Sequence, residues 1–309
     1  MKITRGIENA EFVTPTIATL GSYDGIHLGH RAILETLIRQ KNERGYKRSV
    51  VLTFDPHPQE VLKRNNSSVE LLTTIDERLR LLSEIGIDET IIIKFSFEFS
   101  QTPYSDFFTN TLVKKIGIGA MVVGDNHAFG KNREGDIAHL ELLAQSSGVN
   151  LIEAPPYLID GVHISSTKIR HLLEQGNVQQ VAEYLGRDYE VSGIVVGGDK
   201  LGRSLGYPTA NIQTPSNKLI PRDGVYAGKV IVGTDVFIGA ISIGSRPTVT
   251  DSKERVLEAL LLDFAGDIYG TELQVQLRHY LREQIAFPTL EALQSQMGLD
   301  VQQIRAMKY

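Results

Sequence analysis

The sequence contains no cysteine among its 309 residues. This absence excludes disulfide bonds, thiolate–zinc sites, iron–sulfur clusters and cysteine nucleophiles as the basis of function. A chain of this length can bury a sizeable core without such covalent support, and the lack of thiols is consistent with a reducing cytoplasm. At roughly 150 residues per domain, the length predicts about two domains.

Long apolar runs and an excess of positive charge are also missing. Runs such as residues 259–262 are far shorter than the roughly 20 residues that span a bilayer, and residues 1–8 lack the apolar stretch of a secretory signal. We therefore expect a soluble, cytoplasmic protein with no membrane partner. The 32 Lys and Arg residues against 37 Asp and Glu give a net charge of −5. This balance disfavours nucleic acid as a partner, because phosphate backbones need a basic face.

The first half of the chain alternates uniformly apolar, β-rich runs with helical patterns. Uniformly apolar strands between helices are typical of a parallel sheet covered on both faces. The sequence therefore predicts an α/β domain. The expected strands are residues 16–20, 49–54, 90–93, 120–123 and 150–153, and the expected helices are 32–41, 75–85, 104–115 and 136–147.

The second half is rich in glycine and in short alternating runs, which are typical of antiparallel strands joined by turns. We expect a small β-barrel with a helical tail. Two amphipathic segments connect the halves, and we place the boundary near Gly186, which gives domains 1–186 and 187–309. The connecting segments are 167–174 and 178–185, the expected strands are 190–196, 224–232, 236–243, 256–264 and 273–277, and the expected terminal helices are 289–297 and 301–307.

The sharpest local feature is GSYDGIHLGH at residues 21–30, between the first expected strand and the first expected helix. A ligand crevice is expected at this end of a strand in an open α/β sheet. His27 and His30 would lie on one side of the helix start, where unpaired N–H groups and the helix dipole favour an anion. This combination predicts a site for nucleotide phosphates. A glycine-rich turn with two surface histidines is the alternative, and it more often explains an arbitrary H-x-G-H.

A second polar cluster, ISSTKIR at residues 164–170, places three hydroxyls before an expected helix and Arg170 in its first turn. Alone, this pattern fits a helix N-cap with a solvated arginine. Together with H-x-G-H it resembles the nucleotidylyltransferase superfamily, in which the histidines and the later hydroxyl and arginine cluster hold the phosphates of ATP. The resemblance implies that His27 and His30 act in catalysis and that ATP or its phosphates contact Gly21, Tyr23, Asp24, Gly29, Ser165, Ser166, Thr167 and Arg170.

Further segments narrow the resemblance to the bacterial bifunctional riboflavin kinase/FAD synthetases. TFDPHP at residues 53–58 is similar to the family's loop after the second strand, and also fits a proline-stiffened turn with a capping Asp. VVGDNHAFG at residues 122–130 is similar to the family's flavin-contacting segment G-x-D-F-x-F-G. Asn126 and His127 stand where the family has Asp-Phe. The resemblance implies flavin contacts by Asn126, His127 and Phe129.

A third motif, GRSLGYPTANI at residues 202–212, resembles the riboflavin kinase signature. Residues 197–204 nearly match a phosphate-binding P-loop, but Arg203 stands where Lys is required and the next segment cannot begin a helix cleanly. We therefore reject the P-loop. A β-turn followed by a strand describes the same residues and does not exclude a site. The resemblance implies a glycine flap over ATP with contacts from Gly197, Gly202, Arg203 and Pro208, and Mg²⁺ held by the oxygens of Thr209 and Asn211, which suit a hard cation.

Glu258 lies in the apolar run 257–264 and aligns with the family's catalytic base. A charged residue in such a strand is a surface residue of the alternating pattern about half of the time; within this resemblance we favour the catalytic role. Residues 221–227 and 244–249 also match the kinase domain. Two positions depart from the family: Ser242 replaces a typical Asn, and Leu260 replaces a common His. The resemblance extends from about residue 16 to about residue 307.

The resemblance implies ATP-dependent flavin cofactor synthesis: riboflavin is phosphorylated to FMN, and FMN is adenylylated to FAD with release of pyrophosphate. The implied fold is a Rossmann-like nucleotidyltransferase domain followed by a small antiparallel β-barrel riboflavin-kinase domain with C-terminal helices. The expected partners are riboflavin, FMN, FAD and ATP, with Mg²⁺ as cofactor. Two alternatives stay open. Either one domain alone is active, as an FAD synthetase with an altered flavin redox preference, or the protein is a non-catalytic flavin or nucleotide sensor.

Overall fold

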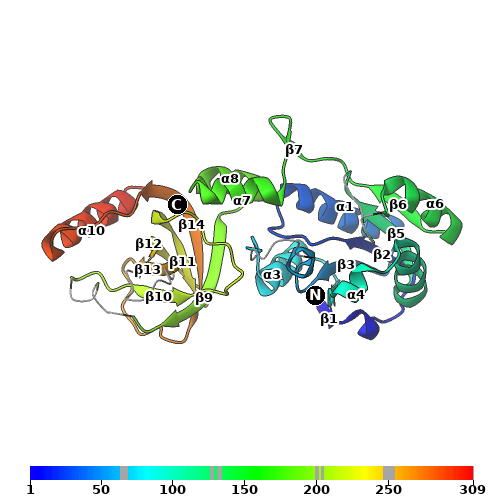
Figure 1. The fold of residues 1–309 in the computed structure, drawn as a ribbon, viewed down its shortest axis with the longest axis horizontal. Coiled ribbons are helices and arrows are strands. Elements are labelled where there is room, and N and C mark those ends of the chain that lie inside the picture. The colour runs from blue at the N-terminus through cyan, green and yellow to red at the C-terminus, as the bar shows by residue number, and fades with distance from the viewer. Residues whose placement is uncertain are drawn as a thin grey trace. The chain divides into compact units, whose positions relative to one another are not determined.

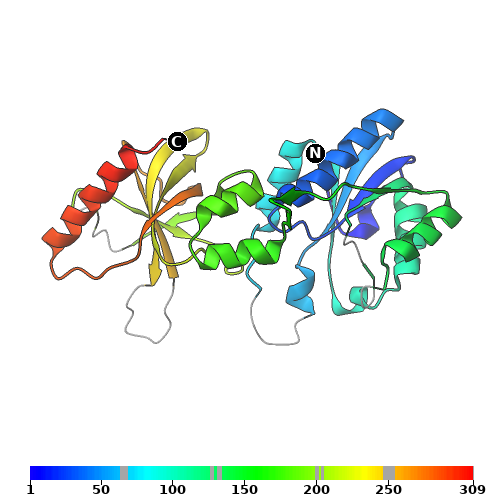
Figure 2. The same ribbon diagram turned by 90° about the horizontal axis from the view of Figure 1, so that it is seen from above.

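The computed structural model describes residues 1–62, 69–125, 129–130, 134–198, 202, 205–245 and 255–308. The chain forms two compact units, Met1–Ser165 and Ser166–Tyr309 (Figures 1 and 2). This division lies ahead of Gly186 because helix α8 (Val178–Leu185) packs on the strands of the second unit. The backbone N–H of Arg222 also donates to the carbonyl of Leu173 at the end of helix α7 (Ser166–Glu174). The boundary near Gly186 marks a change in sequence character and stays a prediction.

The first unit contains a six-stranded, wholly parallel sheet with the order β1-β4-β3-β2-β5-β6. The predicted α/β fold is confirmed. Strand β1 was not predicted, because three of its four residues are exposed and the segment has no apolar run. The strands are β1 (Lys2–Arg5), β2 (Thr16–Leu20), β3 (Arg48–Phe54), β4 (Glu89–Ile93), β5 (Ile118–Val123) and β6 (Asn150–Glu153).

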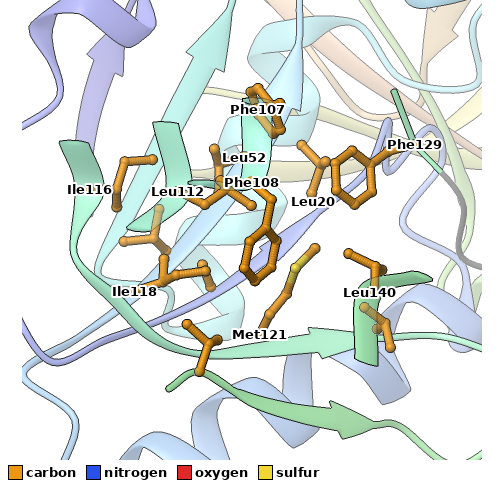
Figure 3. Close-up of a cluster of buried hydrophobic side chains, with 14 of the residues drawn as sticks. Leu20, Leu52, Phe107, Phe108, Leu112, Ile116, Ile118, Met121, Phe129 and Leu140 are labelled. Atoms are coloured by element: carbon orange, nitrogen blue, oxygen red, sulfur yellow. The ribbon is translucent and has the colours of Figure 1, made fainter. Parts of the chain in front are cut away.

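Alternate residues of a strand point to opposite faces of the sheet, and both faces of this sheet are apolar. Helices therefore cover both faces. Leu34 of α1 and Leu82 of α3 pack with Ile17 on one face. Phe108 of η2 and Leu140 of α6 pack with strand residues on the other face, as Figure 3 shows. The four helices are α1 (Leu28–Arg44), α3 (Ile75–Ile85), the π-type helix η2 (Phe107–Ile116) and α6 (Ile137–Ser147).

The remaining elements of the first unit are short. The expected helix 104–115 is divided into α5 (Tyr104–Asp106) and η2, because the backbone widens from an α-turn to π-type turns. A hairpin of β7 and β8 projects from the unit (Figure 1). The other short elements are η1 (Ile7–Asn9), α2 (Pro58–Val61), α4 (Phe97–Ser100), β7 (Leu158–Ile159) and β8 (Val162–His163).

The second unit begins with α7 (Ser166–Glu174) and α8 and continues into a closed antiparallel barrel, as predicted. The strand order around the barrel is β10-β13-β12-β11-β14-β9. Closure leaves no long exposed strand edge. The strands are β9 (Tyr189–Val196), β10 (Ala210–Gln213), β11 (Gly224–Val232), β12 (Asp235–Ser245), β13 (Arg255–Leu261) and β14 (Glu272–Arg282).

A single helix, α10 (Leu290–Arg305), closes the chain, so the expectation of two terminal helices is wrong. Gly298 lies inside this helix, although glycine weakens helices by about 1 kcal/mol relative to alanine. Packing outweighs this cost: Ile304 is buried against the barrel. Asp300, only 5% exposed, accepts hydrogen bonds from Nε and Nη2 of Arg282 at 3.0 and 2.6 Å.

Candidate active sites

The loop after β2 has a constrained backbone. Tyr23 and Ile26 have positive φ angles of 49° and 36°, and Gly25 between them has a φ of 86°. A positive φ is unusual for a bulky residue and persists only where the surroundings determine it, which is common at functional sites. The side chain of Ile26 is buried in the core, so packing fixes the loop from below. The loop leads directly into α1 at the carboxyl end of a central strand.

The two histidines of this loop lie together, as the sequence predicted. His27 caps α1: its Nδ1 accepts a hydrogen bond from the backbone N–H of His30 at 3.2 Å. The two imidazole rings stack with centroids 3.7 Å apart and planes 17° apart. Because Nδ1 of His27 is the acceptor, Nε2 carries the proton of the neutral ring and is a donor. Nε2 of His27, at the N-terminus of α1, is therefore a donor of the kind that binds phosphate.

Gly29 is required for the position of the His27 ring. A Cβ at Gly29 would lie 3.1 Å from Nδ1 and 3.2 Å from Cε1 of His27, closer than these atoms normally approach. We expect Gly29→Ala to displace the ring and lower kcat/KM for any reaction at this site by about 10-fold, since small misplacements are costly in catalysis. Steady-state assays of both units would measure this. An unchanged reaction at the first unit would contradict the prediction.

The side chains of Asp24 and Tyr23 support the loop from inside. Asp24 is 1% exposed and accepts hydrogen bonds from the backbone N–H groups of Leu72 and Thr73 at 3.1 and 2.9 Å. The hydroxyl of Tyr23 is 2.6 Å from that of Thr19, and burial raises the pKa of this phenol well above its ordinary value. The ATP contacts of Tyr23 and Asp24 stay predictions.

The clamp between Asp24 and Thr73 was not predicted from the sequence. The hydroxyl of Thr73 also donates to Asp24 at 3.2 Å and accepts from the N–H of Gly25 at 2.9 Å. One sequence signal marks this segment: Thr74 and Glu77 form the T-x-x-E capping box of α3. The capping box predicts where α3 begins. It does not indicate that the residue before it, Thr73, forms hydrogen bonds with the histidine loop.

The hydroxyl cluster of residues 165–167 spans the division between the units. The carbonyl of Ile164 lies 3.8 Å from the position of a Cβ on Gly29, so the chain just before Ser165 runs beside the start of α1. Ser166, Thr167 and Arg170 belong to α7 in the second unit. That they join His27 and His30 at one phosphate site stays a prediction.

Gly21 is another of the predicted ATP contacts. A Cβ at this position would lie 3.1 Å from the ring of Tyr23.

Phe129 is the described member of the predicted flavin-binding group. It is buried, pairs with Gly135 through backbone hydrogen bonds, and packs edge-on against Phe107 at 5.8 Å. Asn126 and His127 lie outside the described residues, as does Arg203 of the second unit. The flavin contacts of Asn126, His127 and Phe129 stay predictions.

Polar side chains of the second unit gather around Glu258. Glu258 on β13 is paired with Asn211 on β10 and with Ser242 on β12. The hydroxyl of Thr209 donates to Oε2 of Glu258 at 3.2 Å. Glu258 shares its side of the strand with Leu260, which packs against α10 outside the barrel. Glu258 and Asn211 therefore form an oxygen-rich group on the outer wall.

Glycines allow the neighbouring loop to approach this group closely. A Cβ at Gly198 would collide with the side chain of Asn211, and a Cβ at Gly202 would collide with the carbonyl of Tyr207. Gly202 was predicted from the sequence as a site residue, but Gly198 was not. The sequence of the pair Gly197-Gly198 does not indicate which side chain either glycine will contact. Gly197 has open space around its Cβ position, and Pro208 directly precedes Thr209.

The two departures from the kinase pattern have structural explanations. Leu260, 6% exposed, packs with Ile304 and so contributes to the contact between the barrel and α10. The hydroxyl of Ser242 accepts a hydrogen bond from Nε2 of Gln284 at 2.8 Å. Neither departure removes an oxygen from the group around Glu258.

Comparisons with known proteins match one family in each half of the chain. The FAD synthetase family matches residues 9–168, and the riboflavin kinase family matches residues 185–308. The chain belongs to the bifunctional riboflavin kinase/FMN adenylyltransferase family. The protein of that name from Escherichia coli K12 is 36% identical over 306 residues, covering 97% of this chain and 96% of the relative. The one from Haemophilus influenzae is 34% identical over 308 residues, covering 99% of both.

A solved structure is similar over the whole length. The crystal structure described as a macrolide-efflux protein from Streptococcus pneumoniae has a TM-score of 0.91 and 27% identity, with 100% of each chain covered. Within the described part of this chain, no helix is long and apolar enough to cross a membrane. Because both family matches concern flavin enzymes, the expectation of a transferase with two enzymatic domains is confirmed, and the single-activity and sensor alternatives are not supported.

Proposed function

We propose that the chain phosphorylates riboflavin to FMN in the second unit and adenylylates FMN to FAD in the first unit, using ATP in both reactions. The observation that carries this proposal is that one chain holds two separate sites with complementary chemistry. The first has a stacked histidine pair at a helix N-terminus, and the second has a carboxylate beside hydroxyl and amide oxygens. The first set suits the binding of phosphates, and the second suits the activation of an alcohol.

In the kinase reaction, Glu258 is the general base. The 5′-hydroxyl oxygen of riboflavin forms a bond to the γ-phosphorus of ATP, its proton passes to Glu258, and the bond to the leaving ADP breaks. The hydrogen bond from Thr209 orients the carboxylate. Thr209 and Asn211, with Glu258 beside them, offer hydroxyl, amide and carboxylate oxygens, which are the ligands that Mg²⁺ prefers. When bound there, Mg²⁺ supplies charge neutralisation for the transferring phosphate.

In the adenylylation reaction, a phosphate oxygen of FMN forms a bond to the α-phosphorus of ATP, and pyrophosphate leaves. This substitution requires no proton abstraction from FMN and no protein nucleophile. His27 and His30 donate hydrogen bonds to the phosphates, and preorganised donors of this kind stabilise the charge that develops. Ser166, Thr167 and Arg170 are proposed to complete the phosphate contacts.

The remaining contacts and the location of the protein are part of the same proposal. Phe129, with Asn126 and His127, is proposed to contact the flavin ring. A cytoplasmic location is proposed because both reactions consume ATP. That nucleic acid is not a partner rests on the net charge of −5 and stays a prediction.

Product analysis tests the proposal directly. Purified protein is incubated with Mg²⁺-ATP and either riboflavin or FMN, each in oxidised and reduced form, and the flavins are separated by chromatography. We expect riboflavin to give FMN and FAD, and FMN to give FAD. FAD from FMN without any FMN from riboflavin would contradict the bifunctional assignment. A lack of product from every flavin would favour a sensor.

A further inference from the structure

Arg78, on α3 of the first unit, has a guanidinium group with no role in the chemistry described above. The residue is 1% exposed and is the largest of the fully buried side chains. Arginine is almost never buried to this extent unless it is paired. Burial lowers its pKa, whereas the nearby carboxylates of Asp24, Asp55, Glu60 and Glu77 raise it. Burial is the larger of these influences, so the guanidinium is a buried group that depends on the polar atoms around it.

The guanidinium of Arg78 connects two segments of the chain. Nη1 donates to the hydroxyl of Thr53 at 3.2 Å and to the carbonyl of Phe54 at 3.3 Å, both at the carboxyl end of β3. Nη2 donates to the carbonyl of Thr73 at 3.4 Å. Among the residues that the structure describes, Nε has no hydrogen-bond partner.

Each of these two segments in turn holds the histidine loop. On one side, the hydroxyl of Thr53 donates to the carbonyl of Ser22 at 3.2 Å. On the other side, Thr73 holds the carboxylate of Asp24 and the N–H of Gly25. Arg78 is thus connected to the loop through a single residue on each side, Thr53 on one and Thr73 on the other. The loop leads directly into His27, which caps α1.

We propose that Arg78 is a positioning residue for FMN adenylylation: through Thr53 and Thr73 its guanidinium fixes residues 22–25, and so fixes His27 and His30 relative to the phosphates of ATP. Arg78 touches no reacting atom in this account. Methionine at this position would fill most of the volume but would remove the hydrogen bonds from the guanidinium to Thr53, Phe54 and Thr73. The loop would then relax, and the histidine pair would move. This inference rests on the proposed function of the first unit.

The test compares three variants in the intact chain: Arg78→Met, Arg78→Lys and the control Arg80→Met. Arg80 lies on the same helix and pairs with Glu84 at the surface. We expect Arg78→Met to lower kcat for FAD formation about 30-fold with KM for ATP changed less than about 3-fold, because misplaced catalytic groups slow the chemical step. Arg78→Lys should recover part of the loss, since its single ammonium can donate to one of the two segments but cannot connect both. Arg80→Met and the riboflavin kinase activity of every variant should be unchanged.

A merely structural role predicts different results. If Arg78 only stabilises the unit, the loss in kcat will disappear when each variant is assayed about 20 °C below its own melting midpoint, where the folded fraction is complete. The positioning role predicts that the loss persists there. An Arg78→Met protein with wild-type kcat for FAD formation would overturn the inference. If the wild-type protein makes no FAD, the proposed function itself fails, which is a distinguishable result.

A second variant keeps the inference testable if Arg78→Met fails to fold. Thr53→Val keeps the shape of a fully buried side chain and removes only the hydroxyl that connects Arg78 to Ser22. We expect kcat for FAD formation to fall about 5-fold, since the loop loses one of its two connections to Arg78. An unchanged kcat in Thr53→Val would overturn the proposed connection through β3.

Discussion

Replacing Glu258 by glutamine will abolish FMN formation from riboflavin and leave FAD formation from FMN nearly unchanged. Glutamine has almost the same shape and can still accept the hydrogen bond from Thr209. It cannot take the proton of the riboflavin hydroxyl, and loss of a general base typically costs about 10²- to 10⁴-fold in rate. The defect should therefore appear in kcat of the kinase reaction. Chromatography of the products from riboflavin and from FMN measures both activities in one preparation.

The chain offers a matched control for this variant. Glu272 is an exposed carboxylate on β14 of the same barrel, and Glu272→Gln makes the same chemical change away from the oxygen-rich group. We expect Glu272→Gln to keep both activities. If Glu258→Gln lowers both activities equally, the two-site account is wrong, because a single shared site or a general loss of folding would then explain the effect.

Much of the fold could be predicted because strands that are buried on both faces consist mainly of apolar residues. The apolar run of β2 (Thr16–Leu20) has all five residues buried, and the structure gives this strand the predicted bounds. The predicted strand at β6 (Asn150–Glu153) also has the predicted bounds, although its two end residues are exposed. Continuous apolar runs are what a sheet covered on both faces requires. β1 is an edge strand with exposed Lys2 and Arg5, so it lacks that signal.

Sequence motifs located those site residues that are close together in the sequence. His27 and His30 are three residues apart at a helix start, and this spacing alone places them on one side. Glu258, Asn211 and Ser242 come together only because three strands pair in a specific register. The family resemblance predicted two of these residues, and the third was seen only as a departure. Register depends on the closed barrel and cannot be read from a single strand.

The charged residues that hold the site loop and α10 could not be predicted. They are buried, but the sequence around them has the composition of an exposed surface. Arg78 follows Asp76 and Glu77 in a sequence typical of an exposed first helical turn. Its burial results from tertiary contacts with β3 and with Thr73, and composition gives no indication of them. The same applies to Asp300, whose pairing with Arg282 attaches α10 to β14.

Removal of the His30 imidazole will eliminate FAD synthesis while riboflavin phosphorylation continues. In His30→Ala the backbone N–H that caps on His27 remains, so the start of α1 is retained. The ring that stacks on His27 at 3.7 Å and contacts the edge of Tyr23 at 5.2 Å is lost. Removal of one preorganised donor to developing charge costs about 10²- to 10³-fold in kcat. Riboflavin should therefore be converted to FMN, and FMN should accumulate.

Two further variants decide whether this effect reflects the imidazole as a donor. His139→Ala removes an exposed histidine of the same unit and should leave FAD synthesis unchanged. His30→Gln restores an N–H donor without an ionisable ring, and it should recover part of the lost kcat. If His30→Gln is as inactive as His30→Ala, stacking or ring charge is the essential property rather than hydrogen-bond donation. If His30→Ala forms FAD at the wild-type rate, the histidine pair is a structural cap, and the phosphates must be held by other groups, of which the helix N-terminus is the nearest.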